Sequence, residues 1–121
     1  MKFGYFANVT NRHDQPFGVL MNEQIALAQY LDTHDWDSVW YTEHHFSYEG
    51  FEVVPNPVLM STWTAAHTKR LRIGQAANII TFWHPLRFAE DIAMLDHMSG
   101  GRIEVGVGRG IYGREALQLN K

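Results

Sequence analysis

Residues 72–107 decide the fold, and they read RIGQAANIITFWHPLRFAEDIAMLDHMSGGRIEVGV. The first run, 72–80, is nearly all apolar, which is typical of a strand that is buried on both faces of a parallel sheet. A helix is expected to follow, because Pro85 suits a first helical position and Gly100 with its glycine neighbour suits a helix end. A second apolar run covers 102–107. Strand, helix and strand in this order predict one right-handed parallel crossover unit.

The same unit repeats toward the N-terminus. We expect strands over 2–8, 38–42, 72–80 and 102–107, and helices over 22–33, 58–67 and from Pro85 to Gly100. The middle helix has a readable start, with Asn56 as its N-cap and Pro57 at its first position. This alternation predicts an α/β fold with parallel strands.

Two parallel architectures compete for this pattern. A flavodoxin-like open sheet would carry a glycine-rich phosphate loop after its first strand, and residues 9–15 contain no glycine. A TIM-type (βα)8 barrel usually takes about 250 residues. We therefore expect the N-terminal half of such a barrel, with parallel strands and outer helices. Residues 1–121 would form a single domain that stops after the fourth strand, either truncated or completed by another chain.

Composition excludes several classes of protein. The chain has 45% hydrophobic and 19% charged residues and a formal net charge of −3. Without Lys/Arg clusters this balance argues against a nucleic-acid partner. No apolar run approaches the 18 residues of a membrane span, and the N-terminus lacks the pattern of a signal peptide. The absence of cysteine excludes disulfides and thiolate metal sites, so we expect a cytoplasmic protein without membrane contact.

Polar side chains gather just after each expected strand, where a barrel carries its chemistry. They are Asn8 after the first strand, Glu43, His44 and His45 after the second, Asn78 and Trp83 after the third, and Gly108 and Arg109 after the fourth. The opposite strand ends carry only ordinary solvating charges. This asymmetry predicts an active site at the carboxyl ends of the strands.

Each of these residues also has a plainer interpretation. His44 and His45 point to opposite sides of an extended backbone, so we expect only one to face a cavity, and hydrogen bonding alone explains either. Their adjacency does not suit one metal ion, and we predict no metal site. Arg109 among glycines fits a phosphate, although glycines here also fit a tight turn. Trp83 fits packing as well as substrate contact.

Seven stretches of the sequence resemble the bacterial luciferase-like flavin monooxygenases. They are MKFG at 1–4, WYTEHHF at 40–46, NP at 56–57, QAAN at 75–78, HPLRFAED at 84–91, LDHMSGGR at 95–102 and GVGRG at 106–110. The resemblance implies a TIM-type barrel that takes reduced FMN from a separate flavin reductase. Molecular oxygen and the flavin would oxidise a small organic substrate such as an aldehyde. A homo- or heterodimer is expected.

The resemblance also implies roles for individual residues. His44 matches the histidine regarded as the catalytic acid/base, and Glu43 and His45 would shape the substrate pocket beside it. Asn8 and Trp83, from neighbouring strand ends, are further candidates for that pocket.

The cofactor site follows in the same way. Ala76 and Ala77 match a position that often has a non-proline cis peptide against which the flavin ring packs, and Asn78 follows them. Arg109 matches the arginine that contacts the flavin phosphate. Gly108, beside it, stands where luciferase alpha subunits carry a cysteine, so light emission is not implied.

Two other functions remain open at this point. One is a deazaflavin-dependent oxidoreductase of the same superfamily, which transfers hydride and does not use oxygen. The other is a non-catalytic flavin-binding fragment or subunit module.

Overall fold

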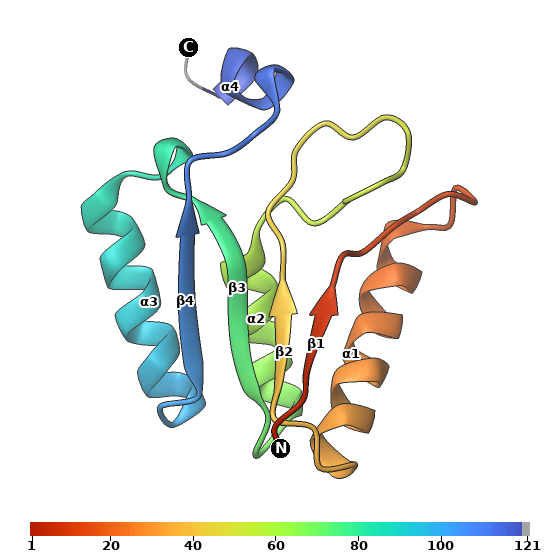
Figure 1. Cartoon of the computed structure of the whole chain (residues 1–121), viewed down its shortest axis with the longest axis vertical. Coiled ribbons are helices and arrows are strands. Elements are labelled where there is room, and N and C mark those ends of the chain that lie inside the picture. Colours follow the sequence, from red (N-terminus) through yellow and green to blue (C-terminus); the bar gives the residue numbers. More distant parts are fainter. Residues whose placement is uncertain (120–121) are drawn as a thin grey trace.

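The computed structural model describes residues 1–119 and contains four parallel strands that alternate with helices (Figure 1). The strands are β1 (Gly4–Ala7), β2 (Ser38–Tyr41), β3 (Arg72–Ile79) and β4 (Ile103–Gly108). The helices are α1 (Phe17–Thr33), α2 (Pro57–His67), α3 (Pro85–Ser99) and α4 (Gly113–Leu119), and one 3₁₀ turn covers Ile80–Phe82. The sheet has the order β1-β2-β3-β4 with every neighbouring pair parallel. The predicted α/β fold class is confirmed.

Helices α1, α2 and α3 form the layer on one face of the sheet and bury the core (Figure 1). Val39 and Tyr41 of β2 and Ile73 of β3 point into this layer and are almost completely buried. The Tyr41 hydroxyl lies 2.9 Å from the Thr64 hydroxyl on α2. Burial raises the pKa of Tyr41 to about 12, against a smaller lowering by this hydrogen bond. The sheet and its helices are thus joined both by apolar packing and by a buried polar contact.

Local sequence signals set the start of α2 and the end of α3 where they were expected. The Asn56 side chain accepts a hydrogen bond from the backbone N–H of Leu59 at 2.9 Å, and Pro57 follows at the first helical position. Gly100 ends α3 with φ of 70°, a left-handed conformation that glycine adopts without a steric penalty. Helix α1 begins at Phe17, five residues before the predicted start at 22. Gly18, a poor helix former, obscures that first turn in the sequence.

The other face of the sheet has no covering layer within residues 1–119. The prediction that the strands are buried on both faces is therefore wrong for β1 and β4, whereas β2 and β3 are mostly buried. Phe6 of β1 is 58% exposed on this face. Trp40 lies across Gly74, so close that a Cβ at position 74 would stand 2.2 Å from the indole. Arg72 and Glu104 form an ion pair at 2.6 Å beside them. Strands β1 and β4 are the two edges of the sheet.

These open edges predict that the chain associates in solution. Unpaired backbone N–H and C=O groups on β1 and β4, together with the exposed Phe6, favour pairing with further strands. Sedimentation velocity at increasing concentration should show species larger than a monomer. A compact monomer with sharp thermal unfolding across the concentration series would contradict this expectation.

None of the helices within residues 1–119 combines the length and the apolar character needed to cross a bilayer.

Candidate functional site

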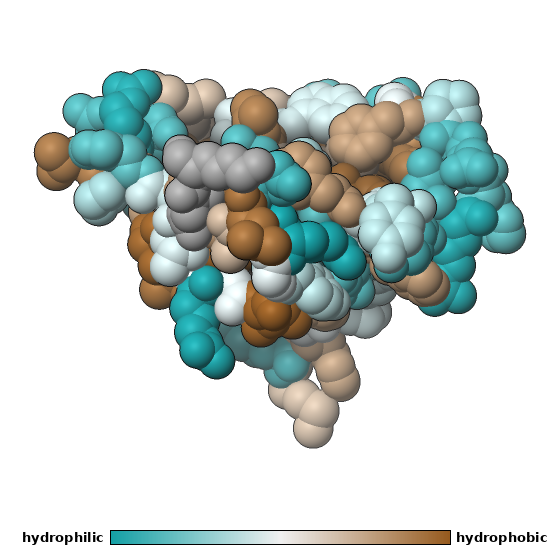
Figure 2. All heavy atoms as spheres, turned by 90° about the horizontal axis from the view of Figure 1, so that it is seen from above, coloured by the Kyte–Doolittle hydropathy of each residue, from teal (hydrophilic) through white to brown (hydrophobic). Residues whose placement is uncertain are grey.

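A cavity of about 320 Å³ lies at the carboxyl ends of the strands, where the sequence predicts the site. Figure 2 views the molecule from this end, where hydrophilic and apolar residues meet on the surface. All four strand ends contribute to the wall, together with the loop after β2. The lining residues are Phe6, Asn8, Thr42, Glu43, His44, Glu52, Ala76, Ala77, Ile79, Gly108, Arg109, Gly110 and Ile111.

Seven of the ten predicted site residues line this cavity. They are Asn8, Glu43, His44, Ala76, Ala77, Gly108 and Arg109. The remaining three, His45, Asn78 and Trp83, lie outside it. The structure therefore brings together residues from β1, the β2 end, β3 and β4 that are far apart in the sequence.

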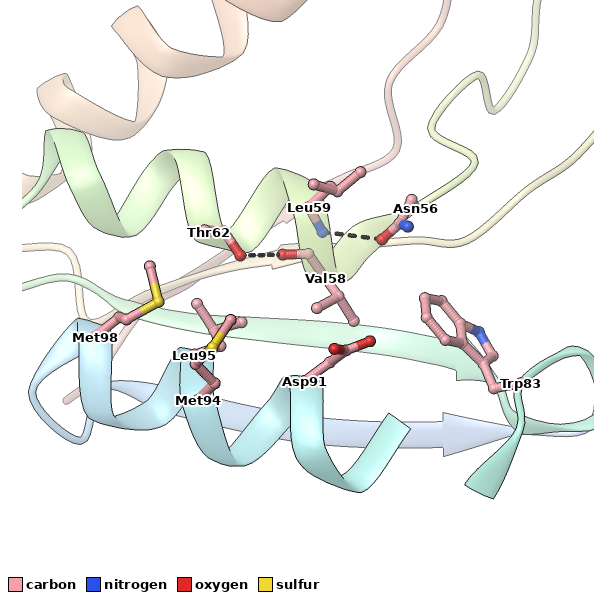
Figure 3. Close-up of a pocket in the computed structure, with 9 residues that line it drawn as sticks. All are labelled: Asn56, Val58, Leu59, Thr62, Trp83, Asp91, Met94, Leu95 and Met98. Atoms are coloured by element: carbon pink, nitrogen blue, oxygen red, sulfur yellow. Dashed lines mark hydrogen bonds between the residues drawn. The ribbon is translucent and has the colours of Figure 1, made fainter. Parts of the chain in front are cut away.

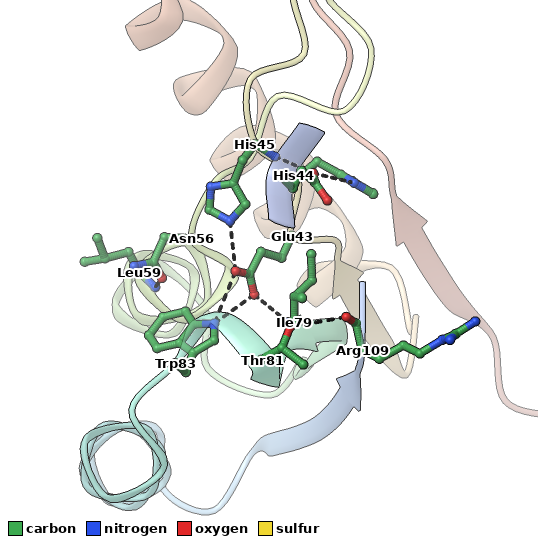
Figure 4. A network of polar contacts seen from close by, with 10 residues as sticks. Glu43, His44, His45, Asn56, Leu59, Ile79, Thr81, Trp83 and Arg109 are labelled. Carbon is green, nitrogen blue, oxygen red and sulfur yellow. Dashed lines mark hydrogen bonds and ion pairs between the residues drawn. The ribbon is translucent and has the colours of Figure 1, made fainter. Parts of the chain in front are cut away.

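Glu43 is a buried acceptor that ties the ends of three segments together (Figure 4). One carboxylate oxygen accepts the backbone N–H of Ile79 at 2.7 Å, and Trp83 Nε1 lies 3.0 Å from the same oxygen. The other oxygen lies 2.9 Å from His45 Nε2. Because its carboxylate is saturated with these partners, Glu43 holds the ends of β2 and β3 in place.

His44 and His45 turn to opposite sides, as alternation along an extended chain requires (Figure 4). The ring of His45 reaches back to Glu43 and packs edge-on against Phe82, 5.8 Å between centroids. His44 extends to the same side as Arg109 and lines the cavity. Only His44 of the pair is placed to meet a bound molecule there.

Asn78 and Trp83 serve the framework around the cavity. The buried Asn78 amide donates to Gln75 Oε1 at 3.3 Å and to the Gly106 carbonyl at 3.1 Å, so it joins β3 to β4. The 3₁₀ turn after β3 carries Trp83 outward, where it lines a separate cleft of about 220 Å³ between α2 and α3 (Figure 3). Trp83 thus does not line the cavity itself, and its link to the cavity wall is its hydrogen bond to Glu43.

The peptide bond between Ala76 and Ala77 is cis, as the family resemblance predicts. Ala77 faces Gly108 across the β3–β4 pair, where a Cβ on Gly108 would stand 3.5 Å from the Ala77 Cβ. None of Ala76, Ala77 and Gly108 has a side chain larger than a methyl group. This part of the wall can therefore be approached closely by a flat ring.

Arg109 is the cation of the cavity wall. Its backbone carbonyl accepts a hydrogen bond from the Thr81 hydroxyl at 3.2 Å, which fixes the main chain. Within residues 1–119 its guanidinium has no hydrogen bond or ion pair, and the side chain is exposed. Arg109 is consequently available to an anion.

Two carboxylates beside His44 were not predicted from the sequence. Glu52, in the loop after β2, lies 3.6 Å from His44 Nε2, and Glu115 of α4 lies 3.7 Å from His44 Nδ1. Helix α4 has seven residues, too few for a periodic signal, and the loop has none. Neither carboxylate could have been distinguished from an ordinary solvating residue. The described residues contain no group of three or more His, Asp or Glu side chains arranged to hold a metal ion.

The contacts of Glu43 predict a loss of stability when its charge is removed. In Glu43→Gln the amide keeps the shape but has one accepting oxygen in place of two, so an N–H₂ group faces either the Ile79 N–H or the His45 ring. We expect unfolding free energy to fall by about 1–2 kcal/mol. Urea denaturation monitored by tryptophan fluorescence measures it. Glu90→Gln on the exposed face of α3 is the control, and equal losses in the two variants would contradict the role of Glu43.

Known proteins resemble this chain along nearly its whole length. The sequence matches the family described as luciferase-like monooxygenase over residues 1–118. It is 35% identical over 116 residues to the oxygenase component of flavin-dependent trigonelline monooxygenase from Acinetobacter baylyi, covering 95% of this chain and 32% of that protein. It is 33% identical over 115 residues to the alkanal monooxygenase alpha chain of Photorhabdus laumondii, again covering 95% of this chain and 32% of that protein.

Solved structures agree with the sequence match. The oxygenating constituent of 3,6-diketocamphane monooxygenase from Pseudomonas putida, solved in complex with FMN, superimposes with a TM-score of 0.90 at 26% identity. That match covers 97% of this chain and 32% of the other. The coenzyme F420-dependent tetrahydromethanopterin reductase of Methanopyrus kandleri gives a TM-score of 0.70 at 23% identity, over 91% of this chain and 27% of the other. This second likeness is one of fold alone.

The chain spans about a third of the length of the curated relatives it matches. Its four parallel strands and their helices correspond to about 30% of the length of the TIM-type barrel proteins of this kind. From the family match over residues 1–118 and the shared fold, this chain belongs to the luciferase-like monooxygenase family.

Proposed function

We propose that this chain contributes to a flavin-dependent monooxygenase that uses reduced FMN and molecular oxygen to oxidise a small organic substrate. One observation carries the proposal: His44, the small residues Ala76 and Ala77, and Arg109 come from three strand ends and line one cavity. The relatives named as flavin-dependent monooxygenases, and the P. putida structure named as an FMN complex, support this assignment.

The cavity fits FMN in two respects. The guanidinium of Arg109, which has no partner within the described residues, suits the phosphate, since a planar fork of donors matches phosphate oxygens. Ala76, Ala77 and Gly108 leave the wall open to close approach of the isoalloxazine ring. Reduced FMN, when bound, supplies the electrons that activate oxygen.

His44 is the proton-handling group in this proposal. Imidazole gains and loses a proton near neutral pH, and oxygen insertion requires protons to be delivered and removed at the reacting atoms. The apolar residues Phe6, Ile79 and Ile111 line the same cavity and offer an apolar surface to a substrate. A small apolar molecule such as an aldehyde would contact both the His44 ring and these apolar side chains.

Partners follow from the same proposal. Reduced FMN would come from a separate flavin reductase, in keeping with the relative that is named an oxygenase component. A homo- or heterodimer and a cytoplasmic location stay predictions. His45 and Trp83 would shape the pocket only through their hydrogen bonds to Glu43.

Comparison of two cofactors tests the function. The protein is mixed anaerobically with reduced FMN or with a reduced deazaflavin, and then exposed to oxygen and a straight-chain aldehyde. We expect tight binding and oxidised product with FMN only. Hydride transfer with the deazaflavin and no oxygen consumption would favour the oxidoreductase alternative. Flavin binding without any product would favour a non-catalytic module.

A further inference from the structure

Within residues 1–119, two neighbouring side chains behind the cavity each have a buried polar atom without a hydrogen bond. The Glu115 side chain is completely buried; its Oε1 accepts the backbone N–H of His45 at 2.7 Å, but its Oε2 has no hydrogen bond. His44 Nδ1 is also buried without a hydrogen bond, and it lies 3.7 Å from Glu115 Oε1. A buried carboxylate with unused accepting capacity thus faces a ring nitrogen with an unused position.

The segment that carries Glu115 is packed onto the end of β2 by several contacts. The ring of Tyr112 lies 5.6 Å from the His44 ring, and the Arg114 guanidinium lies over Tyr112 at 4.6 Å. Arg114 also approaches Glu49 at 3.9 Å. These contacts place the start of α4 over the loop after β2 and explain how a residue 70 positions away reaches His45.

The other nitrogen of His44 has different surroundings. Nε2 lies 3.6 Å from Glu52, whose side chain is 19% exposed and lines the cavity with His44. Glu52 already accepts a hydrogen bond from the Tyr112 hydroxyl, and that bond is the main cause of the raised pKa of Tyr112. The ionisable groups around the His44 ring are therefore Glu115 on the buried side and Glu52 with Tyr112 on the cavity side.

We propose that Glu115 is a positioning residue for His44: it holds Nδ1 as the protonated nitrogen and leaves Nε2 to act in the cavity. The proposal rests on the proposed function for its catalytic meaning. A carboxylate can only accept a hydrogen bond, so Glu115 favours a proton on Nδ1 and Glu52 favours one on Nε2. The Glu115 side chain is completely buried whereas that of Glu52 is partly exposed, and water therefore screens the attraction of Glu115 less. Such contacts are often long without a bound ligand and tighten in the reacting complex. Because Glu115 also binds the His45 N–H, it fixes both the main chain and the ring.

A purely structural role makes a different prediction. If Glu115 only satisfies the His45 N–H, its removal destabilises the loop but leaves the tautomer of His44 unchanged. The protonated nitrogen of the His44 ring is therefore the discriminating observable, and it can be measured without flavin or substrate.

Nitrogen-15 NMR of the ring nitrogens in the folded full chain tests the proposal. The His44 signals are assigned by their loss in His44→Gln, and the spectra are recorded at a pH where the ring is neutral. We expect a protonated Nδ1 and a bare Nε2 in the unaltered protein. Glu115→Gln keeps an oxygen that can accept and should keep this tautomer, whereas Glu115→Ala should shift the population toward a protonated Nε2. Glu49→Gln is the matched control, since Glu49 contacts the same segment but not His44.

The outcomes are decisive even if Glu115→Ala does not fold. A protonated Nε2 with a bare Nδ1 in the unaltered protein overturns the proposal, as does an unchanged tautomer in a folded Glu115→Ala variant. In turnover with reduced FMN, Glu115→Ala should lower kcat by at least about tenfold while the FMN dissociation constant stays within about twofold. A protein that shows the expected tautomer but forms no product would disprove the proposed function and retain the positioning by Glu115.

Discussion

Replacing His44 by alanine should lower turnover with reduced FMN and oxygen by roughly 100-fold or more, while FMN affinity is nearly unchanged. The ring lines the cavity but makes no hydrogen bond that holds the fold together, since both carboxylates beside it lie beyond 3.5 Å. Loss of the imidazole therefore removes a proton-transfer group and the ring contact with Tyr112, but no side-chain hydrogen bond within residues 1–119. Steady-state product formation and equilibrium FMN binding, measured on the same preparation, separate the two effects.

Two comparison variants sharpen this test. His97→Ala, on the exposed side of α3 and away from the cavity, should leave turnover unchanged. His45→Ala removes the contact with Glu43 and should lower stability and turnover together. If His44→Ala retained most of its product yield, or lost FMN affinity and stability in parallel with activity, His44 would not be the acid/base.

Replacing Arg109 by alanine should weaken FMN binding by roughly 1.5–3 kcal/mol, the range for a hydrogen bond to a charged group. This corresponds to about a 10- to 150-fold rise in the dissociation constant. The physical reason is that the Arg109 guanidinium lies at the cavity wall and has no partner within residues 1–119, where only the Arg109 backbone carbonyl makes a hydrogen bond with a side chain. Quenching of flavin fluorescence on titration with protein measures the change.

Arg109→Lys should restore only part of the affinity, because an ammonium group lacks the planar fork that matches phosphate. Arg87→Ala provides the control: this arginine is exposed on α3, pairs with Glu90 at 3.1 Å and lies outside the cavity. Equal FMN affinity in Arg109→Ala and the unaltered protein would disprove the phosphate contact.

Most of the fold could be predicted from local sequence signals. Asn56 and Pro57 act through a local side-chain hydrogen bond and a fixed backbone angle, so the predicted start of α2 agrees with the structure. Gly100 acts through its own backbone conformation, so the predicted end of α3 agrees as well. The start of α1 was wrong because the pairing of Phe17 and Gly18 gives no clear propensity signal. The exposure of β1 could not be read from its apolar sequence, because burial depends on what covers the second face of the sheet.

The candidate site was predictable only where it follows from strand ends. His44 and Arg109 lie at the cavity because the carboxyl ends of parallel strands meet at one edge of the sheet. Trp83 follows β3 in sequence, but a 3₁₀ turn redirects the chain before it. Glu115 reaches His44 through a helix that packs back on the loop after β2, a tertiary contact with no local signal.

Oxygen-isotope labelling tests the central claim most directly. The folded full chain is mixed with photoreduced FMN, a straight-chain aldehyde and ¹⁸O₂, and the product is analysed by mass spectrometry. A monooxygenase that works through this cavity should place one atom of ¹⁸O from molecular oxygen in each product molecule, and His44→Ala should abolish most of that signal. Product without the label, or no product above a control lacking the protein, would contradict the account.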